Sequence, residues 1–222
     1  MKAKNGSLKV NRRKDILRAA EKLMVSRGLS GITTRQISEE AGCSEGALYV
    51  HFKSRLDLLL AMLEESLPEM LRPLRTLQQQ VGRGSPHVNL AAALRGIFRF
   101  HQRATPRVAG LFADPELHAA FRASLLRQNK GPHLSLKVLE DYIAAEQELG
   151  RIDRRAEPQL AAYVLMSCSF FRAFSEQFFG RPLPPAWGKL VKQLIVAVVP
   201  VADATKRRAN IKSGTMGLER VM

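Results

Sequence analysis

Side chains with the chemistry needed to contact DNA lie between residues 34 and 53. Arg35 carries a guanidinium fork that fits the O6 and N7 atoms of guanine together. Tyr49 offers an aromatic ring for a base or a sugar and a hydroxyl group for a phosphate. His51 and Lys53 follow on one edge, where their nitrogen atoms can meet phosphates. A generic three-helix bundle with a buried tyrosine is the alternative interpretation of this segment.

Two short helices are expected to present these side chains. The candidate N-terminal caps are Thr33 or Thr34 for the first helix, and Ser44 for a second helix over 45–51. The turn between the helices is expected to begin at Gly42. A tight turn needs a residue with a positive φ, which glycine adopts readily and a Cβ atom disfavours. Residues 33–52 therefore have the helix-turn-helix arrangement, in which the second helix lies in the DNA major groove.

An inward-facing Leu48 determines which residues of the second helix face outward. At about 100° per residue, Glu45, Gly46, Tyr49 and Val50 then point away from the core. Gly46 allows the helix to approach DNA closely. The core of this segment is predicted to consist of Ile32, Ile37, Ala41, Cys43, Leu48 and Phe52.

Positive charge is concentrated in the N-terminal quarter of the 222-residue chain. The whole chain has 35 Lys and Arg against 20 Asp and Glu, a formal net charge of +15. Residues 1–55 hold 12 basic and 5 acidic side chains, residues 56–202 hold 18 and 13, and residues 203–222 hold 5 and 2. A solubilising surface would explain dispersed charge. Its concentration in the first segment favours an anionic partner such as nucleic acid.

Apolar residues recur at helical spacing along the chain, and no sustained strand pattern interrupts them. The apolar face of the first helix, 12–27, consists of Ile16, Ala19, Ala20, Leu23 and Met24, with Gly28 as its C-terminal cap. Further helices are expected at 54–80, 87–104, 106–113, 115–149, 157–179 and 185–202, with a break at Gly131-Pro132 left open. The sequence therefore predicts an all-α fold.

One set of short motifs is specific enough to suggest a family. It consists of Gly28-Leu29 before Thr33-Thr34, Ile37 before Ala41-Gly42-Cys43-Ser44, then Gly46-Ala47-Leu48-Tyr49 and His51-Phe52-Lys53-Ser54. With these motifs, residues 11–63 resemble the N-terminal DNA-binding domain of the TetR/AcrR transcriptional regulators. The resemblance implies a three-helix DNA-binding domain followed by a larger helical domain for ligand binding and dimerisation.

The resemblance also implies roles for individual residues. It implies phosphate contacts for Thr34, Tyr49, His51 and Lys53, and positions near base edges for Arg35, Ser44, Glu45 and Gly46. Two residues depart from the common pattern. Glu45 stands where many members have lysine or another polar residue, so its carboxylate repels phosphate, accepts from a cytosine N4 amino group, or points away. Val50 either packs on a thymine methyl group or simply fills space.

Four segments are expected along the chain. They are a basic flexible N-terminus (1–10), the DNA-binding domain (11–55), an effector-binding and dimerisation domain (56–202) and a basic flexible tail (203–222). Helices near 157–179 and 185–202 are too apolar for one-sided surface helices. The resemblance implies that they form the four-helix bundle of a homodimer, and core helices of a monomer are the alternative.

The middle helices supply candidates for an effector pocket. These candidates are Phe98, His101, Phe112, Tyr142, Met166 and Phe170. Because aromatic and methionine side chains at helical spacing more often belong to a core, no ligand identity is predicted.

Several other classes are disfavoured by the sequence. The histidines are scattered, and neither a Gly-rich phosphate loop nor a nucleophile elbow occurs, so no enzyme activity, cofactor or metal is expected. No apolar stretch approaches the roughly 20 residues of a membrane span. Neither a secretory signal nor a disulfide framework from the two cysteines is expected. A cytoplasmic, nucleoid-associated protein without a membrane partner is expected.

The sequence as a whole predicts a DNA-binding transcriptional regulator. The expected mechanism is that of a ligand-responsive repressor, whose homodimer binds a palindromic double-stranded operator through residues 33–52 and responds to an unidentified small-molecule effector. The alternative function is that of an architectural DNA-associated protein, which binds without choosing a sequence.

Overall fold

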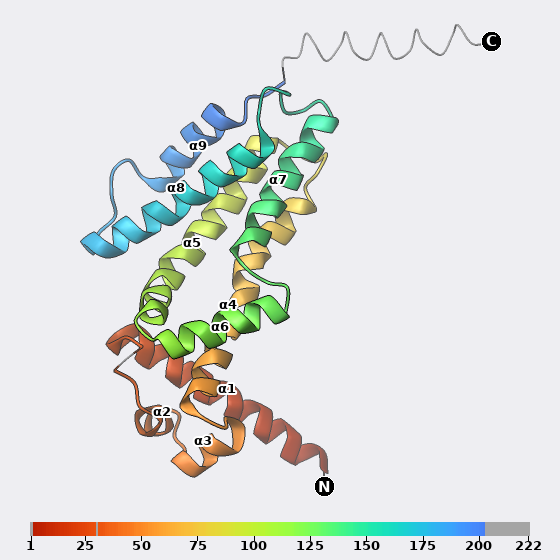
Figure 1. Ribbon diagram of the computed structural model, residues 1–222. Coiled ribbons are helices and arrows are strands. Elements are labelled where there is room, and N and C mark those ends of the chain that lie inside the picture. The colour runs from red at the N-terminus through yellow and green to blue at the C-terminus, as the bar shows by residue number, and fades with distance from the viewer. Residues whose placement is uncertain (1, 30, 203–222) are drawn as a thin grey trace, which may run out of the picture. The chain divides into compact units, whose positions relative to one another are not determined.

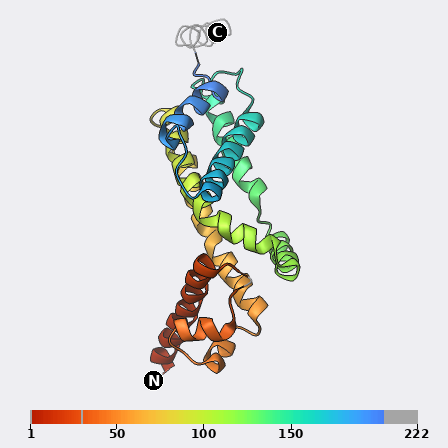
Figure 2. The ribbon, with the colours of Figure 1, turned by 90° about the vertical axis from the view of Figure 1, so that its left-hand side faces the viewer.

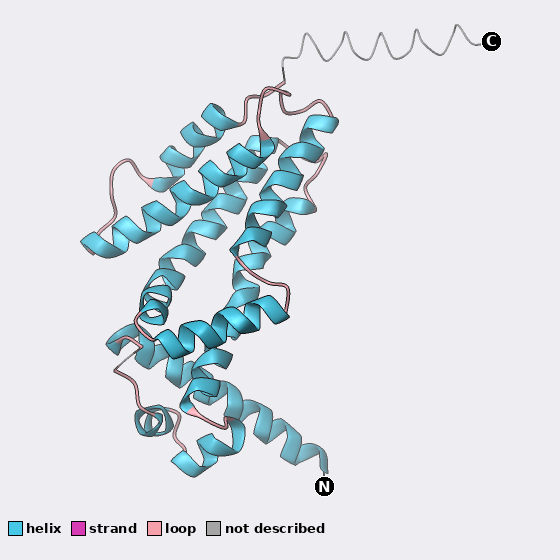
Figure 3. Ribbon diagram, viewed as in Figure 1, coloured by secondary structure: helices cyan, strands magenta, loops and turns pink. Residues whose placement is uncertain are grey.

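Helices make up the regular structure of residues 2–29 and 31–202, the part of the chain that the computed structural model describes (Figure 3). The same residues also contain an isolated antiparallel β-bridge between Ile152 and Val201. The helices are α1 (Lys2–Arg27), α2 (Thr34–Glu40), α3 (Glu45–His51), α4 (Arg55–Gln78), α5 (Pro86–Phe112), α6 (Pro115–Arg127), α7 (Pro132–Glu148), α8 (Pro158–Phe179) and α9 (Trp187–Val198). The predicted all-α fold is confirmed.

Residues 2–69 and 102–131 form the first of two compact units. The apolar face predicted for α1 is buried, and α1 packs against α2 and α3 (Figure 1). Leu58 and Leu59 of α4, Leu111 of α5 and Leu117 of α6 complete the same core. The unit therefore joins the expected DNA-binding segment to the start of α4, the end of α5 and the whole of α6.

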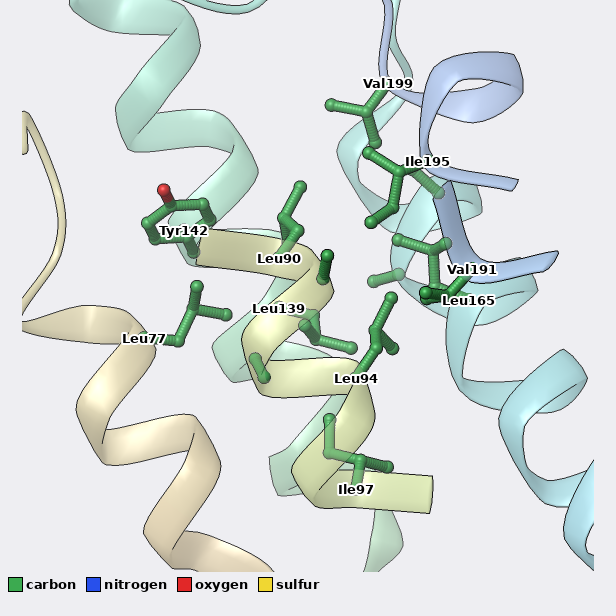
Figure 4. Close-up of a cluster of buried hydrophobic side chains, with 14 of the residues drawn as sticks. Leu77, Leu90, Leu94, Ile97, Leu139, Tyr142, Leu165, Val191, Ile195 and Val199 are labelled. Carbon is green, nitrogen blue, oxygen red and sulfur yellow. The ribbon is translucent and has the colours of Figure 1, made fainter. Parts of the chain in front are cut away.

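The second unit contains residues 70–101 and, within the described chain, 132–202. Figure 4 shows its core, where apolar side chains of α4, α5, α7, α8 and α9 meet around Leu94 and Leu139. Helices α8 and α9 lie side by side (Figure 2), with Val191 and Ile195 of α9 fully buried. Burial of this apolar surface is the main stabilising contribution to the unit.

A buried ion pair joins two loops of the second unit. The Glu146 carboxylate on α7 is fully buried, and its Oε2 lies 3.0 Å from Nε of Arg151. Its Oε1 accepts a hydrogen bond from the backbone N–H of Gly82 at 3.1 Å. Because a buried charge needs such partners, Glu146 holds the loop before α5 and the loop after α7 in place.

The residues that follow α9 are connected back to the second unit. The backbone N–H of Asp153 donates to the carbonyl of Pro200 at 2.9 Å, beside the bridge between Ile152 and Val201. The His87 ring donates from Nε2 to the carbonyl of Val199 at 2.6 Å. The chain up to residue 202 is therefore part of this unit.

The break left open at Gly131-Pro132 occurs, because α6 ends at Arg127 and α7 begins at Pro132. The helix boundaries differ most from the predicted ones at two other places. The separate helices expected at 87–104 and 106–113 are wrong, because α5 continues through Pro106. Burial of Phe98 before the proline and Leu111 after it outweighs the hydrogen bond that proline cannot donate. In addition, α1 begins at Lys2, inside the segment expected to precede the helices. The tail at 203–222 lies outside the described residues.

Candidate functional site

The helix-turn-helix is built by local hydrogen bonds that the sequence specifies. Thr33 caps α2 by accepting from the backbone of Gln36, and the Gln36 side chain accepts from the backbone of Thr33 in return. Gly42 adopts a φ of +63° in the turn, which favours glycine. Ser44 then caps α3 by accepting from the N–H of Ala47 at 3.2 Å. The predicted caps are confirmed.

Burial of Leu48 orients the exposed face of α3. Leu48 and Ile37 are fully buried, whereas Tyr49 and Val50 are 47% and 68% exposed. Glu45 and Gly46 are exposed as well. The core predicted for this segment forms as expected: Ile32, Ile37, Leu48 and Phe52 are buried, and Ala41 and Cys43 pack against them.

Three of the predicted DNA-contacting residues form a hydrogen-bonded chain across α2 and α3. The hydroxyl of Thr34 donates to Oε1 of Glu45 at 2.7 Å. The hydroxyl of Tyr49 in turn donates to Oγ1 of Thr34 at 3.4 Å. This chain positions two hydroxyl groups on the exposed face, and the Thr34 hydroxyl connects Tyr49 to the Glu45 carboxylate at its end.

The other predicted contact residues surround this chain. Arg35 is exposed and paired through Nε with Glu39 at 3.0 Å, which leaves the donors on Nη1 and Nη2 for a base. Ser44 is used as the cap of α3, and a Cβ atom at Gly46 would meet only Oγ of Ser44, at 3.9 Å. His51 is half-buried against Phe52, and Lys53 is exposed.

Two arginines of α1 support the helix-turn-helix, which the sequence did not indicate. Arg12 donates from Nη1 to the carbonyls of Ala41 and Gly42, both at 3.4 Å, at the end of α2. Arg13 lies over the ring of Phe52, 5.2 Å from its centroid, and pairs with Glu65 at 2.6 Å. These contacts involve residues far apart in sequence, so local patterns carried no signal for them.

Arg55 connects the turn before α2 to the rest of the first unit. Its Nη2 and Nε donate to the carbonyls of Leu29 and Ile32 at 3.0 and 3.1 Å. Its Nη1 lies 3.7 Å from a carboxylate oxygen of Asp114, which also caps α6 by accepting from Leu117. One guanidinium group therefore holds both the turn and the start of α6.

The candidate effector residues occupy different environments. Phe98 is buried and stacks on Trp187 at 4.9 Å, and Tyr142 is fully buried, with its hydroxyl accepting from Asn89 at 3.0 Å. Met166 is partly buried against the same core. Phe112 belongs to the first unit, is 67% exposed and contacts the ring of His118.

His101 and Phe170 lie together in the second unit. Their rings meet edge to face at 5.6 Å, and Nδ1 of His101 lies 3.2 Å from Oγ of Ser169. Burial lowers the pKa of His101 from 6.5 to about 4, because the charged ring would lose its hydration. The imidazole is therefore neutral at neutral pH and can exchange hydrogen bonds with a polar neighbour.

Helix α8 carries an exposed row of aromatic side chains. The row consists of Tyr163, Phe170, Phe171, Phe174 and Phe178, with Phe179 beside it, each at least 45% exposed. Phe174 and Phe178 stack at 6.1 Å. Exposed apolar surface of this extent is typical of a protein–protein contact. On α9, Leu190, Leu194 and Val198 are partly buried, and Val196 is 63% exposed.

The described residues contain no group of three or more histidine, cysteine, aspartate or glutamate side chains arranged to hold a metal ion. None of their helices is long and apolar enough to cross a membrane.

Comparisons with known proteins agree with this geometry. The sequence profile of a family described as bacterial regulatory proteins, tetR family, matches residues 16–62. The nucleoid occlusion factor SlmA of Vibrio cholerae is 30% identical over 168 residues, which cover 67% of this chain and 83% of SlmA.

Solved structures share the fold. A TetR-family transcriptional regulator from Mesorhizobium loti superposes with a TM-score of 0.67 at 16% identity, over 86% of this chain and 94% of that protein. SmeT, the repressor of the Stenotrophomonas maltophilia multidrug efflux pump SmeDEF, gives 0.61 at 24% identity, over 86% and 91%. Its triclosan complex gives 0.65 at 23% identity, over 87% and 93%. Together with the helix-turn-helix geometry, these matches establish that the chain belongs to the TetR family of DNA-binding bacterial transcriptional regulators.

Proposed function

We propose that this regulator is a ligand-responsive repressor whose homodimer binds a palindromic operator. The exposed chain of Thr34, Glu45 and Tyr49 on a capped helix-turn-helix is the observation that carries the proposal. In this scheme phosphates contact Thr34, Tyr49, His51 and Lys53, and base edges lie near Arg35, Ser44, Glu45 and Gly46. A protein acting on operators in this way works in the cytoplasm, at the nucleoid.

The homodimer part of the proposal is supported by the aromatic row of α8 and the apolar residues of α9. A monomer in water would leave Phe171 and Phe178, which are 69% and 73% exposed, without a partner. A twofold dimer buries the same surface on both protomers and supplies two helix-turn-helix units for two half-sites.

The effector part of the proposal is supported by the environment of His101. A half-buried, neutral imidazole beside the Ser169 hydroxyl and the Phe170 ring combines apolar and polar contacts, which small-molecule sites require. The SmeT complex with triclosan shows that a protein of this fold can hold a small molecule. A ligand that binds one dimer geometry better than another would shift the fit to the operator.

A footprinting experiment on the DNA around the gene for this protein tests the proposal. We expect a protected palindrome that survives a large excess of scrambled competitor duplex and is released by one member of a panel of small molecules. Loss of protection in parallel with added competitor would contradict operator recognition.

Such a loss would instead favour an architectural role without sequence choice. The name of the V. cholerae relative, nucleoid occlusion factor, is the observation that keeps this second function in view.

A further inference from the structure

A long segment outside the helix-turn-helix carries basic residues without acidic ones. Residues 70–113 contain seven arginines and neither aspartate nor glutamate. The arginines are Arg72, Arg75, Arg83, Arg95, Arg99, Arg103 and Arg107. Arg107 is buried and pairs with Glu21, so it is accounted for within the first unit. Arg72, Arg75, Arg95 and Arg99 add positive charge that the groove-reading residues do not use.

Four of these arginines lie on two helices that touch within the second unit. Helix α4 presents Arg72 and Arg75, helix α5 presents Arg95 and Arg99, and all four are exposed. No residue of the described chain forms an ion pair or a hydrogen bond with their guanidinium groups. A Cβ atom at Gly96 would lie 2.8 Å from Cβ of Pro73, so the helices are in close contact at this point.

The contact between Pro73 and Gly96 determines how the arginines are oriented. At about 100° per residue, Arg72 is rotated away from Pro73 around α4, and Arg99 is rotated away from Gly96 around α5. Both rotations have the same sense about the axis of their own helix. In two antiparallel helices, equal rotation away from the contact leads to the same face of the pair. We call this surface, made by Arg72, Arg75, Arg95 and Arg99, the α4–α5 arginine face.

The surface around these arginines is nearly free of large apolar groups. Ala92 and Thr76 are exposed between the two rows, and Gly96 adds no side chain. Within the described residues from 72 to 101, Val88 is the large hydrophobic side chain that is exposed. The buried centre of a protein–protein contact is generally apolar, with aromatic side chains among its anchors. Nucleic-acid backbones instead bind to polar, strongly positive surfaces.

We propose that the α4–α5 arginine face binds the phosphodiester backbone of nucleic acid, separately from the groove-reading residues of α2 and α3. Each guanidinium group can donate two parallel hydrogen bonds to one phosphate. Arg95 and Arg99 are one helical turn apart, about 6 Å along the axis, so they meet different phosphates. This contact adds affinity that is independent of sequence and does not require an operator.

The test compares two charge-matched variants of the full-length protein on a scrambled 30-base-pair duplex. Arg95→Gln/Arg99→Gln removes two charges from the arginine face, and Arg122→Gln/Arg127→Gln removes two exposed charges from α6. We expect the slope of log K against log salt concentration to become shallower by about 2 for the first variant, since each phosphate contact contributes about 0.9. The second variant should retain the slope of the wild type.

The same pair of variants is then measured in a Tyr49→Ala/Lys53→Ala background. Here the face variant should lose most of the remaining DNA binding, and the α6 variant should keep it. Equal slopes and equal losses for the two variants would overturn the proposal. So would displacement of the duplex by poly-L-glutamate at the same concentration of charge, because the face would then prefer acidic polypeptide.

Failure of this proposal is distinguishable from failure of the proposed function. A protected palindrome with identical salt slopes for the two variants would leave the repressor intact and remove the arginine face. Absence of a protected palindrome, together with a shallower slope for the face variant, would support the arginine face and contradict the repressor.

Discussion

Helices α3 and α8 each expose a surface that is not needed for the core of their own unit, but the two surfaces differ in kind. Helix α3 presents Glu45 and Tyr49, whose polar atoms are connected through Thr34. Helix α8 presents aromatic rings such as Phe174 and Phe178. Polar groups constrain a partner by direction and charge, whereas aromatic rings constrain it by shape and area. The chemistry of the first surface therefore indicates its ligand class much more closely than that of the second.

The largest expected effect tests the aromatic surface. Phe174→Arg/Phe178→Arg introduces four unpaired charges into a twofold contact, and burying each phenylalanine is worth about 1.5–3 kcal/mol. We expect a dimer at micromolar concentration to become a monomer, with dissociation at least about 100-fold easier, as measured by light scattering. Leu126→Arg on α6, where the leucine is 73% exposed, is the control and should remain dimeric. A dimer in the double variant would assign the contact to another surface.

A second variant tests whether the helix-turn-helix, which carries the polar surface, depends on the contacts of Arg55 to the turn before α2. Arg55→Met removes two hydrogen bonds to the carbonyls of Leu29 and Ile32 and the partner of Asp114. The expected loss in the free energy of unfolding is about 2–3 kcal/mol, because charged hydrogen bonds to partly buried carbonyls are lost. Thermal unfolding measures it, with the exposed Arg18→Met as control. Identical melting curves would show that the turn holds without Arg55.

Acid should weaken the second unit through His101. The ring binds a proton with a pKa of about 4 when folded and 6.5 when unfolded, so the unfolded chain takes up more protons between these values. Stability is complete above pH 6.5 and falls by about 2–3 kcal/mol as the pH decreases to 4. Chemical unfolding at several pH values measures this loss, and His101→Gln should flatten it. An unchanged slope in that variant would assign the effect to other groups.

Base recognition on α2 is tested by Arg35→Ala. We expect a loss of about 1–3 kcal/mol in operator binding, confined to one base-pair position, because one bidentate contact to guanine disappears. A set of operator duplexes with single substitutions measures it by titration. Uniform weakening over the set would mean that Arg35 contacts phosphate instead.

The smallest expected effect separates the charge of Glu45 from its hydrogen bond. Glu45→Gln keeps an oxygen that accepts from Thr34 but removes the repulsion of phosphate. Affinity for every duplex should rise by about threefold at low salt, equivalent to less than about 1 kcal/mol, and the gain should disappear at high salt. Weaker binding limited to sites with one particular cytosine would show that the carboxylate accepts from its N4 amino group.

Contacts between residues that are close in the sequence could be predicted, and contacts between residues far apart in it could not. The caps of α2 and α3 and the turn at Gly42 depend on residues three or four apart, and all were predicted. The inward position of Leu48 and the outward position of Tyr49 follow from helical geometry in the same way.

Contacts between distant residues left no such pattern. Arg12 reaches carbonyls 29 and 30 residues away, and Arg55 reaches one 26 residues away, so neither support was predicted. Pro106 indicated a break that the packing of α5 overrides. For the same reason the candidate effector residues, chosen by type alone, are distributed between a closed core, an exposed ring and the vicinity of His101.

The pairing of residues 152 and 153 with 200 and 201 determines where this chain can be shortened or joined to another protein. A truncation before Pro200 removes the acceptor for the N–H of Asp153, and a cut one residue earlier, before Val199, also removes the acceptor for His87. A fluorescent protein or an affinity tag attached after residue 202 keeps both contacts. Libraries of C-terminal deletions should therefore lose folded protein abruptly as the end point moves from residue 202 toward residue 198.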